Sequence, residues 1–239
     1  MTRLSVNINK IATLRNARGG NMPDVCRAAL DCEAFGAEGI TMHPRPDERH
    51  IRYADVRQIR PLLATEFNME GNPIPSFADL ALQVLPDQVT LVPDAPDAIT
   101  SNAGWDTIAN KDFLTGIVSR FKSRGIRVSI FIDPDPKMAL GAKECGADRV
   151  ELYTAAYAAQ YPSGRQEAIA PYLQTALAAR DCGLGLNAGH DLSLENLEYF
   201  IKTIPWTDEV SIGHAIVCDA LYMGLEKTIK AYLSQIKIF

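Results

Sequence analysis

The chain has 239 residues, of which 47% are hydrophobic and 22% are charged. This composition excludes an extended disordered chain, and the length is that of one globular domain. The formal net charge of -5 argues against a general nucleic-acid surface, so an anionic ligand must be bound by a local cluster of cations. We expect a single catalytic domain over residues 1–239.

The sequence begins Met1-Thr2-Arg3-Leu4 and contains no apolar run of the roughly 18 residues that a membrane span requires. We therefore expect a soluble, cytoplasmic protein. The cysteines stand at spacings that match neither a zinc ribbon nor a CxxC redox pair. They predict buried thiols, and we expect no metal site.

Short apolar or β-branched runs alternate with longer segments of helical period along the whole chain. This alternation is typical of βα units around a parallel sheet. We expect strands at Leu4–Asn9, Gly39–His43, Glu66–Glu70, Gln88–Val92, Arg127–Ile132, Arg149–Leu152, Gly185–Asn187 and Glu209–Ile212.

The segments between these strands carry apolar residues at steps of three and four, which predicts helices with one buried face. Two such stripes are made by Val56, Ile59, Leu62 and Leu63, and by Phe113, Ile117 and Phe121. Helix starts are expected at Ser76, at Pro134 and Pro136, and at Ser193.

Eight successive strand and helix units favour a closed α/β barrel, the (β/α)8 or TIM barrel, with short extra helices. An open doubly wound sheet is the alternative, but the chain lacks a Gly-rich GxGxxG turn after the first expected strand. No Pro/Gly/Ser-rich linker or charge block divides the sequence.

Polar residues gather where the expected strands end. Because the carboxyl ends of barrel strands meet at one rim, where active sites of such barrels lie, these residues predict one common site. A lone His or Glu in a barrel is more often structural, but polar residues at the ends of so many expected strands favour a functional site. The set comprises Asn7, Asn9, His43, Arg45, Glu70, Glu151, His190, Gly213 and His214.

The segment His43–His50 places two arginines and two histidines in one βα loop, which can bind a phosphate dianion. A solvated basic loop is the alternative. Gly213-His214 after the last strand permits close backbone approach to a second anion, although the motif alone is weak. His190 follows a small-residue turn and suits a proton donor or acceptor.

Thr100 lies in Pro93–Trp105, a stretch rich in Asp, Pro, Ala and Gly. Such a stretch can close over a site and reach a ligand, and a plain surface loop is the equal alternative.

The segment Val6–Gly19 strongly resembles the pyridoxine 5'-phosphate synthase family of the deoxyxylulose-dependent vitamin B6 pathway. The likeness covers essentially the whole chain. It continues through Gly39–His43, Arg49–Ile51, Asn68–Glu70, Leu91–Pro93, Val128–Asp133, Asn187–His190 and Ile212–Ile216.

The resemblance implies a transferase that condenses 3-amino-2-oxopropyl phosphate with 1-deoxy-D-xylulose 5-phosphate. The products are pyridoxine 5'-phosphate, inorganic phosphate and water, and the family uses no metal or organic cofactor. The chemistry combines acid/base-assisted imine formation, elimination and aldol-type ring closure. Family members form homo-oligomers, which implies a homo-octamer, with the apolar segment Leu221–Leu233 as a candidate interface.

The resemblance also implies a role for each site residue. His43 and Glu70 match proton acceptors, His190 matches a proton donor, and Glu151 matches a group that stabilises a cationic transition state. The residues that match contacts to the deoxyxylulose phosphate are Asn9, Lys10, Arg45, His50 and Thr100. Those that match contacts to the aminoketone phosphate are Asn7, Arg18, Gly213 and His214. Asp191 matches a position that binds a phosphate through its backbone N–H.

Two departures from the familiar family motif fall on ligand-binding positions. Asn9-Lys10 stands where the motif has Asp-His, and Asp191 stands where it has Gly. We expect Asp191 to point to solvent while its backbone N–H binds phosphate. The competing hypotheses are another phosphosugar aldolase or isomerase, and a non-catalytic barrel that binds phosphometabolites.

Overall fold

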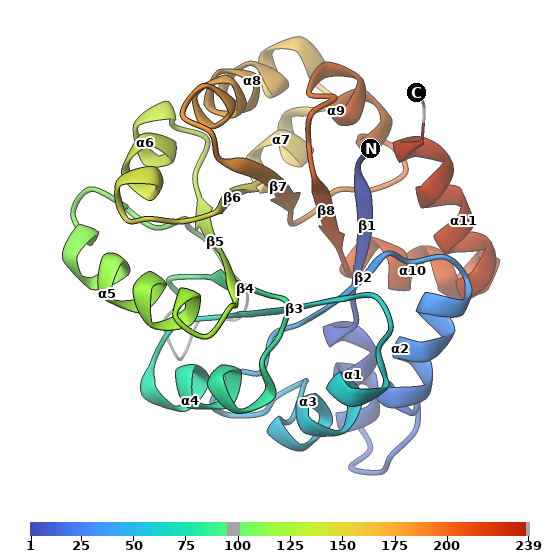
Figure 1. Cartoon of the computed structure of the whole chain (residues 1–239). Coiled ribbons are helices and arrows are strands. Elements are labelled where there is room, and N and C mark those ends of the chain that lie inside the picture. The colour runs from blue at the N-terminus through green and yellow to red at the C-terminus, as the bar shows by residue number, and fades with distance from the viewer. Residues whose placement is uncertain (95–100, 238–239) are drawn as a thin grey trace.

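The computed structural model describes residues 1–94 and 101–237. The strands form one closed parallel barrel in chain order, and β8 pairs back with β1 (Figure 1). The expected TIM barrel is confirmed, with strand ends that differ from expectation by at most two residues. The strands are β1 (Arg3–Asn7), β2 (Gly39–Met42), β3 (Glu66–Gly71), β4 (Gln88–Leu91), β5 (Arg127–Ile132), β6 (Arg149–Tyr153), β7 (Gly185–Gly189) and β8 (Glu209–Ile212).

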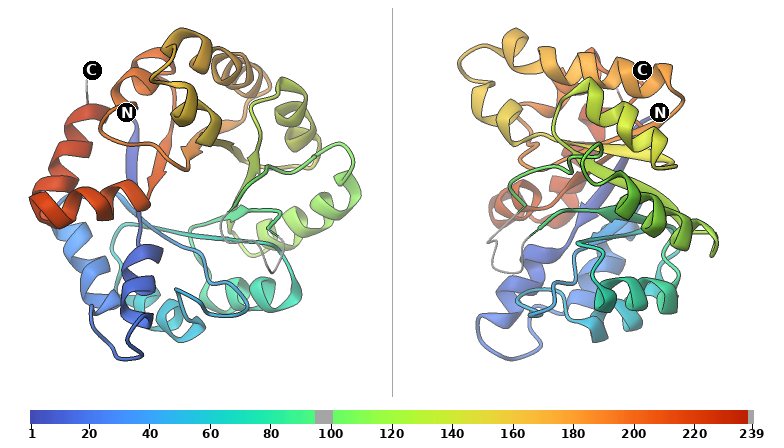
Figure 2. Two further views of the ribbon diagram at one scale, coloured as in Figure 1. Left: turned by 180° about the vertical axis from the view of Figure 1, so that it is seen from behind. Right: turned by 90° about the vertical axis from the view of Figure 1, so that its left-hand side faces the viewer.

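Helices surround the barrel on all sides (Figure 2). The expected short extra helices occur where one connection carries two helices, as after β1, β6 and β8. The helices are α1 (Asn9–Asn16), α2 (Val25–Ala34), α3 (Tyr53–Ile59), η1 (Arg60–Leu62), α4 (Pro75–Val84), α5 (Lys111–Lys122), α6 (Pro136–Glu144), α7 (Ala155–Gln160), α8 (Arg165–Asp181), α9 (Leu197–Thr203), α10 (His214–Met223) and α11 (Leu225–Ile236). None of the described helices is long and apolar enough to cross a membrane.

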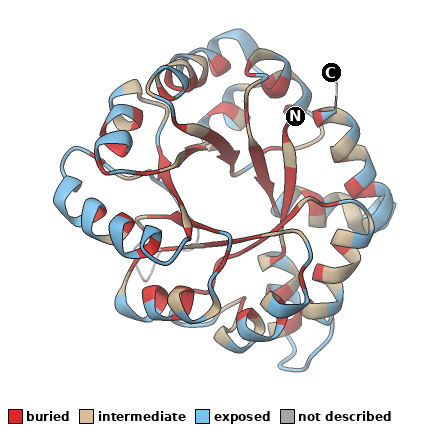
Figure 3. Ribbon diagram, viewed as in Figure 1, coloured by how far each residue is buried: buried red, intermediate tan, exposed pale blue. Residues whose placement is uncertain are grey.

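The strands alternate between apolar residues and polar residues that face into the barrel, and nearly all of them are buried (Figure 3). Thr90 of β4 donates to Glu151 of β6, two strands away, at 3.3 Å. Both side chains therefore point into the barrel. Asn68 of β3 continues this interior network by donating to Thr41 at 3.3 Å. Such barrels commonly fill the interior with branched apolar residues, so a polar centre is a distinctive feature of this chain.

Several local expectations were wrong. Asn9 does not end the first strand, because β1 stops at Asn7 and Asn9 opens α1. Phe113 and Leu62 are 48% and 50% exposed rather than buried. The buried stripe of α5 is Leu114, Val118 and Phe121, whose steps of four and three put Phe113 on the outer face.

Helix α4 begins at Pro75, and α9 begins only at Leu197, after the expected start at Ser193. The cysteines are free, but they are not all buried. Cys218 is exposed, and Cys26 and Cys182 are half-buried.

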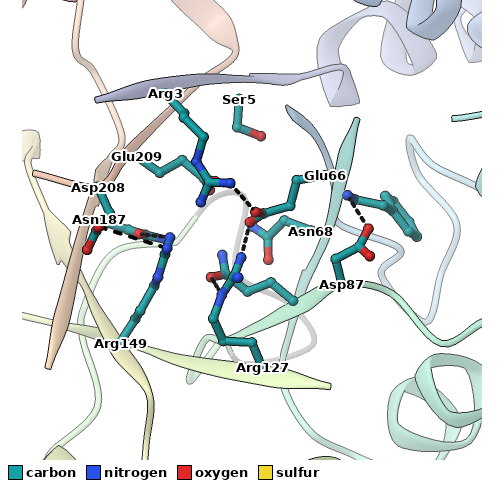
Figure 4. A network of polar contacts seen from close by, with 12 residues as sticks. Arg3, Ser5, Glu66, Asn68, Asp87, Arg127, Arg149, Asn187, Asp208 and Glu209 are labelled. Atoms are coloured by element: carbon teal, nitrogen blue, oxygen red, sulfur yellow. Dashed lines mark hydrogen bonds and ion pairs between the residues drawn. The ribbon is translucent and has the colours of Figure 1, made fainter. Parts of the chain in front are cut away.

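The amino ends of the strands carry a separate layer of charges (Figure 4). Glu66, the first residue of β3, accepts from Arg3 at 2.6 Å and also from Arg127. Glu209, the first residue of β8, is buried next to this pair. Charged residues at this end of a barrel contribute to stability rather than to chemistry, which occurs at the opposite rim.

Candidate active site

A cavity of about 400 Å³ opens at the carboxyl ends of the strands. Side chains from β1, β3, β6 and β8, and from the loops after β2 and β7, meet around it. Most of the residues expected from the sequence contribute to its wall. The lining consists of Asn7, Asn9, Lys10, His43, Arg45, His50, Glu70, Val92, Ser101, Phe131, Glu151, His190, Asp191, Ser211, Gly213 and His214.

Among the described residues, Arg18 does not line the cavity and is exposed in the turn that follows α1. Thr100 lies outside the described residues. Their expected contacts with substrate stay predictions.

Glu70 lies at the end of β3, where two neighbours hold its carboxyl group. Asn7 donates to it at 3.2 Å and Ser211 donates at 3.3 Å. Burial raises the pKa of Glu70 to about 7, and the negative charge of Asp94 adds to this effect against the hydrogen bond from Ser211. A carboxyl group with this pKa can take or release a proton near neutrality.

Glu151 lies deeper, in the middle of β6, and is 2% exposed. Burial, then the charges of Glu70 and Glu209, raise the pKa of Glu151 well above its ordinary value. The cavity therefore favours the protonated form of this carboxyl group. Gly189 leaves room for it, since a Cβ atom at that position would lie 2.5 Å from Glu151 Oε1.

The loop after β2 supplies two imidazoles that are neutral at ordinary pH. Burial and then the charge of Arg45 lower the pKa of His43 well below its ordinary value. The same two causes lower the pKa of His50 to about 4. His50 Nδ1 accepts from the Ile51 N–H at 2.9 Å, which leaves its proton on Nε2. The positive charge in this loop therefore comes from its arginines.

Asp94 is a site residue that the sequence argument missed. It follows β4, is 6% exposed, and forms a buried ion pair with Arg45. Its carboxylate also accepts from Ser101 at 3.0 Å and lies 3.8 Å from His43 Nε2. Asp94 thus fixes the guanidinium of Arg45 at the edge of the cavity. Its place in a Pro- and Asp-rich stretch gave no sign of burial.

Asn7 and Asn9 organise the wall between β1 and β2. The Asn7 side chain donates to Glu70 and accepts from the Asn9 N–H at 3.0 Å. Asn9 Oδ1 accepts from the His43 N–H at 3.0 Å. The departure from Asp to Asn therefore keeps a hydrogen-bond acceptor for the His43 backbone. Lys10 adds a cation to the cavity at the start of α1.

Gly213 and His214 connect β8 to α10. A Cβ atom at Gly213 would lie 2.9 Å from the Asn7 carbonyl oxygen, so the position requires glycine for close backbone approach. His214 is the first residue of α10. Backbone N–H groups at the start of a helix are well placed to bind an anion.

His190 and Asp191 follow β7, and both have positive φ angles, of 83° and 61°. Asp191 Oδ2 lies 2.9 Å from His190 Nδ1. The Asp191 side chain is 47% exposed, yet it lines the cavity and is directed to the imidazole. We expected the Asp191 side chain to point to solvent. It is partly exposed, but it also contacts the His190 imidazole, which we did not expect.

Other lining residues carry no charge and had no strand-end motif to mark them. They are Val92, Ser101, Phe131 and Ser211. Within the described ranges, no group of three or more His, Cys, Asp or Glu side chains is arranged to hold a metal ion.

Comparisons with solved structures show barrels of the same fold. A 3-keto-L-gulonate-6-phosphate decarboxylase from Vibrio cholerae superimposes with a TM-score of 0.67 at 12% identity, covering 100% of this chain and 98% of that one. A phosphoribosyl anthranilate isomerase from Thermotoga maritima gives 0.63 at 16% identity, covering 100% of both chains. These identities support the fold alone.

Comparisons of sequence find much more similar proteins. Residues 4–238 match the family model described as pyridoxal phosphate biosynthesis protein PdxJ. The chain is 65% identical over 232 residues to the pyridoxine 5'-phosphate synthase of Bacteroides thetaiotaomicron, covering 97% of this chain and 98% of the relative. It is 63% identical over 237 residues to that of Cytophaga hutchinsonii, covering 99% and 100%. The chain therefore belongs to the pyridoxine 5'-phosphate synthase family.

Proposed function

We propose that this enzyme joins 3-amino-2-oxopropyl phosphate to 1-deoxy-D-xylulose 5-phosphate, giving pyridoxine 5'-phosphate, phosphate and water. One observation carries the proposal. Acid/base groups from several strands converge on one cavity, and Glu70 among them has a pKa raised to about 7 by burial. A condensation with several proton transfers needs such a set of groups.

Two parts of the cavity wall suit phosphate groups. Arg45 and Lys10 bring positive charge, and His50 can donate from Nε2, so this part suits the deoxyxylulose phosphate. Gly213 and His214 open the N-terminus of α10, which suits the aminoketone phosphate. Two phosphorylated substrates account for two separate anion sites.

The ionisation of the wall supports distinct roles in proton transfer. Neutral His43 can accept a proton, and Glu70 can serve as a base near neutrality. Burial favours the protonated form of Glu151, but a cationic imine beside it favours the ionised form. Its carboxylate then stabilises that intermediate. His190 is the proton donor in this scheme.

We also propose a homo-oligomer, with the octamer as the expected form. In α10, Leu221 and Tyr222 are 74% and 93% exposed, and Met223 is exposed beside them. A second copy of this chain can cover such an apolar patch. Light scattering on Leu221→Asp should show a smaller assembly than the wild type. An unchanged mass would remove this patch from the interface. The cytoplasmic location stays a prediction.

The alternatives fit the cavity less well. Among the described lining residues Lys10 is the only lysine, and it lies on the exposed first turn of α1, whereas a Schiff-base aldolase uses a buried amine. A non-catalytic barrel has no need for Glu70 poised near neutrality.

The test supplies both substrates and follows the pyridine product with purified wild type and His190→Asn. Turnover that is at least about 100-fold slower in the variant supports the proposal. Binding of both substrates by the wild type without product would favour the non-catalytic barrel.

A further inference from the structure

The loop after β7 holds an arrangement that the proposed roles do not use. His190 and Asp191 are consecutive, and the carboxylate of Asp191 lies 2.9 Å from the Nδ1 atom of His190. A carboxylate can only accept, so Nδ1 carries the proton of this bond. Adjacent side chains of an extended strand point to opposite faces, and only the unusual backbone of this loop brings the two together.

That backbone costs free energy, because L-residues rarely adopt positive φ. Here two successive residues do so, with φ angles of 83° and 61°. Buried groups maintain the conformation. Thr154 Oγ1 donates to the Gly189 carbonyl at 2.7 Å and also to that of His190. Asn196 Nδ2 donates to the Asp191 carbonyl at 3.2 Å.

The imidazole also contacts an aromatic ring. Tyr153 meets the His190 ring edge-on, with ring centroids 5.0 Å apart. The ring is thus placed by the contact with Tyr153 and by the Asp191 carboxylate on Nδ1. The hydrogen bond to His190 is the main cause that lowers the pKa of Asp191, so the carboxylate stays ionised at neutral pH.

We propose that Asp191 is a positioning residue for the reaction, which orients the His190 imidazole, keeps a proton on Nδ1, and leaves Nε2 to deliver the transferred proton. The inference rests on the proposed role of His190 as proton donor. Donation requires the imidazolium form, and a carboxylate beside Nδ1 compensates that positive charge. Asp191 thereby adds to the family's reaction a carboxylate–imidazole pair that the familiar motif, with glycine here, cannot form.

Other charged and titratable groups also face this pair. The groups whose charges act on His190 or Asp191, or whose rings contact them, are Lys10, Glu70, Asp94, Tyr153 and His214. Lys10 and His214 lower the pKa of Asp191 together with His190. The variants must therefore leave these groups in place.

Two substitutions fit the backbone at this position. Asn and Gly both adopt positive φ readily, so Asp191→Asn and Asp191→Gly should fold without added strain. The matched control is Glu195→Gln, an exposed carboxylate in the same loop that makes the same change in net charge. We expect kcat to fall about 10-fold in both Asp191 variants, with KM for either substrate changed less than about 3-fold. The control should keep wild-type kcat.

A spectroscopic readout separates this proposal from turnover. The chain has four histidines, so selective ¹⁵N labelling gives an assignable spectrum. We expect His190 of the wild type to carry a proton on Nδ1 in both its neutral and its imidazolium form, and both Asp191 variants to show a mixture of neutral tautomers, while the control matches the wild type. Identical ¹⁵N shifts in wild type and Asp191→Asn would overturn the proposal, as would a kcat within about 2-fold of wild type in that variant. If the wild type made no product but the shifts behaved as expected, the proposed function would fail while the pairing would stand.

Discussion

Glu70 is the residue whose protonation state should set the pH dependence of the reaction. Burial and the charge of Asp94 raise the pKa of its carboxyl group to about 7. A general base acts in its ionised form, so kcat/KM should rise with pH through about 7 and then level off. Glu70→Gln should lower kcat/KM by about 100-fold or more and remove that step. An unchanged pH profile in the variant would assign the step to another group.

The residues around Glu70 show why the burial of a single side chain is difficult to infer from the sequence. The ends of the strands identified Glu70, His43 and His190, because a barrel brings those ends together. Asp94 was missed, since its stretch has the composition of a surface loop. Its burial depends on Arg45, 49 positions earlier in the chain, which only the folded barrel places beside it.

The turn between β8 and α10 is the element on which the second anion site depends. In Gly213→Ala the new methyl group would lie 2.9 Å from the Asn7 carbonyl oxygen, so the turn must shift. We expect about a 10-fold rise in KM for the aminoketone phosphate and a loss of about 1–3 kcal/mol in stability. Steady-state kinetics and thermal unfolding measure the two effects.

The control for this substitution is Gly116→Ala in α5. A Cβ atom there meets nothing within 4 Å, and alanine is the better helix former by about 0.5–1 kcal/mol. This variant should be slightly more stable than wild type, with unchanged kinetics. Equal behaviour of the two variants would contradict the claim that Gly213 is required by its close contact.

Prediction of elements from the sequence succeeded where the period was clear. In β5, Arg127, Ser129 and Phe131 share one face, and Val128, Ile130 and Ile132 form a wholly apolar second face, which is the pattern of a buried strand. Helix phase was less secure. In α5 both Phe113 and Leu114 are apolar, and only packing against the barrel decides that Leu114 is buried while Phe113 is exposed.

At the scale of the whole molecule, the charged layer at the amino ends of the strands links stability to pH (Figure 4). Burial, then the neighbouring Glu66, raises the pKa of Glu209 to about 8 from an ordinary value of 4.5. Burial raises the pKa of Glu66, but hydrogen bonds from Arg127 and Glu209 and the charges of Arg127 and Arg3 together bring this pKa below its ordinary value. At neutral pH Glu209 is therefore protonated beside an ionised Glu66.

The direction in which stability changes with pH follows from the protons that the folded and unfolded chains bind. Between about pH 4.5 and 8 the folded chain holds a proton on Glu209 that the unfolded chain has lost, so stability falls as pH rises through this window. Glu209→Gln keeps a neutral group and loses this dependence. Its Tm relative to wild type should increase from about pH 5 to about pH 9, by about 2–4 °C for each kcal/mol. A constant difference in Tm would show that Glu209 does not titrate in this range.

Acid/base groups of one barrel rim should suffice to build the pyridine ring from two phosphorylated substrates. The most direct measurement mixes purified enzyme with 3-amino-2-oxopropyl phosphate and 1-deoxy-D-xylulose 5-phosphate in metal-chelated buffer, and records the pyridine chromophore together with released phosphate. We expect equimolar ring and phosphate. Phosphate release without ring, or no reaction unless a metal is restored, would contradict it.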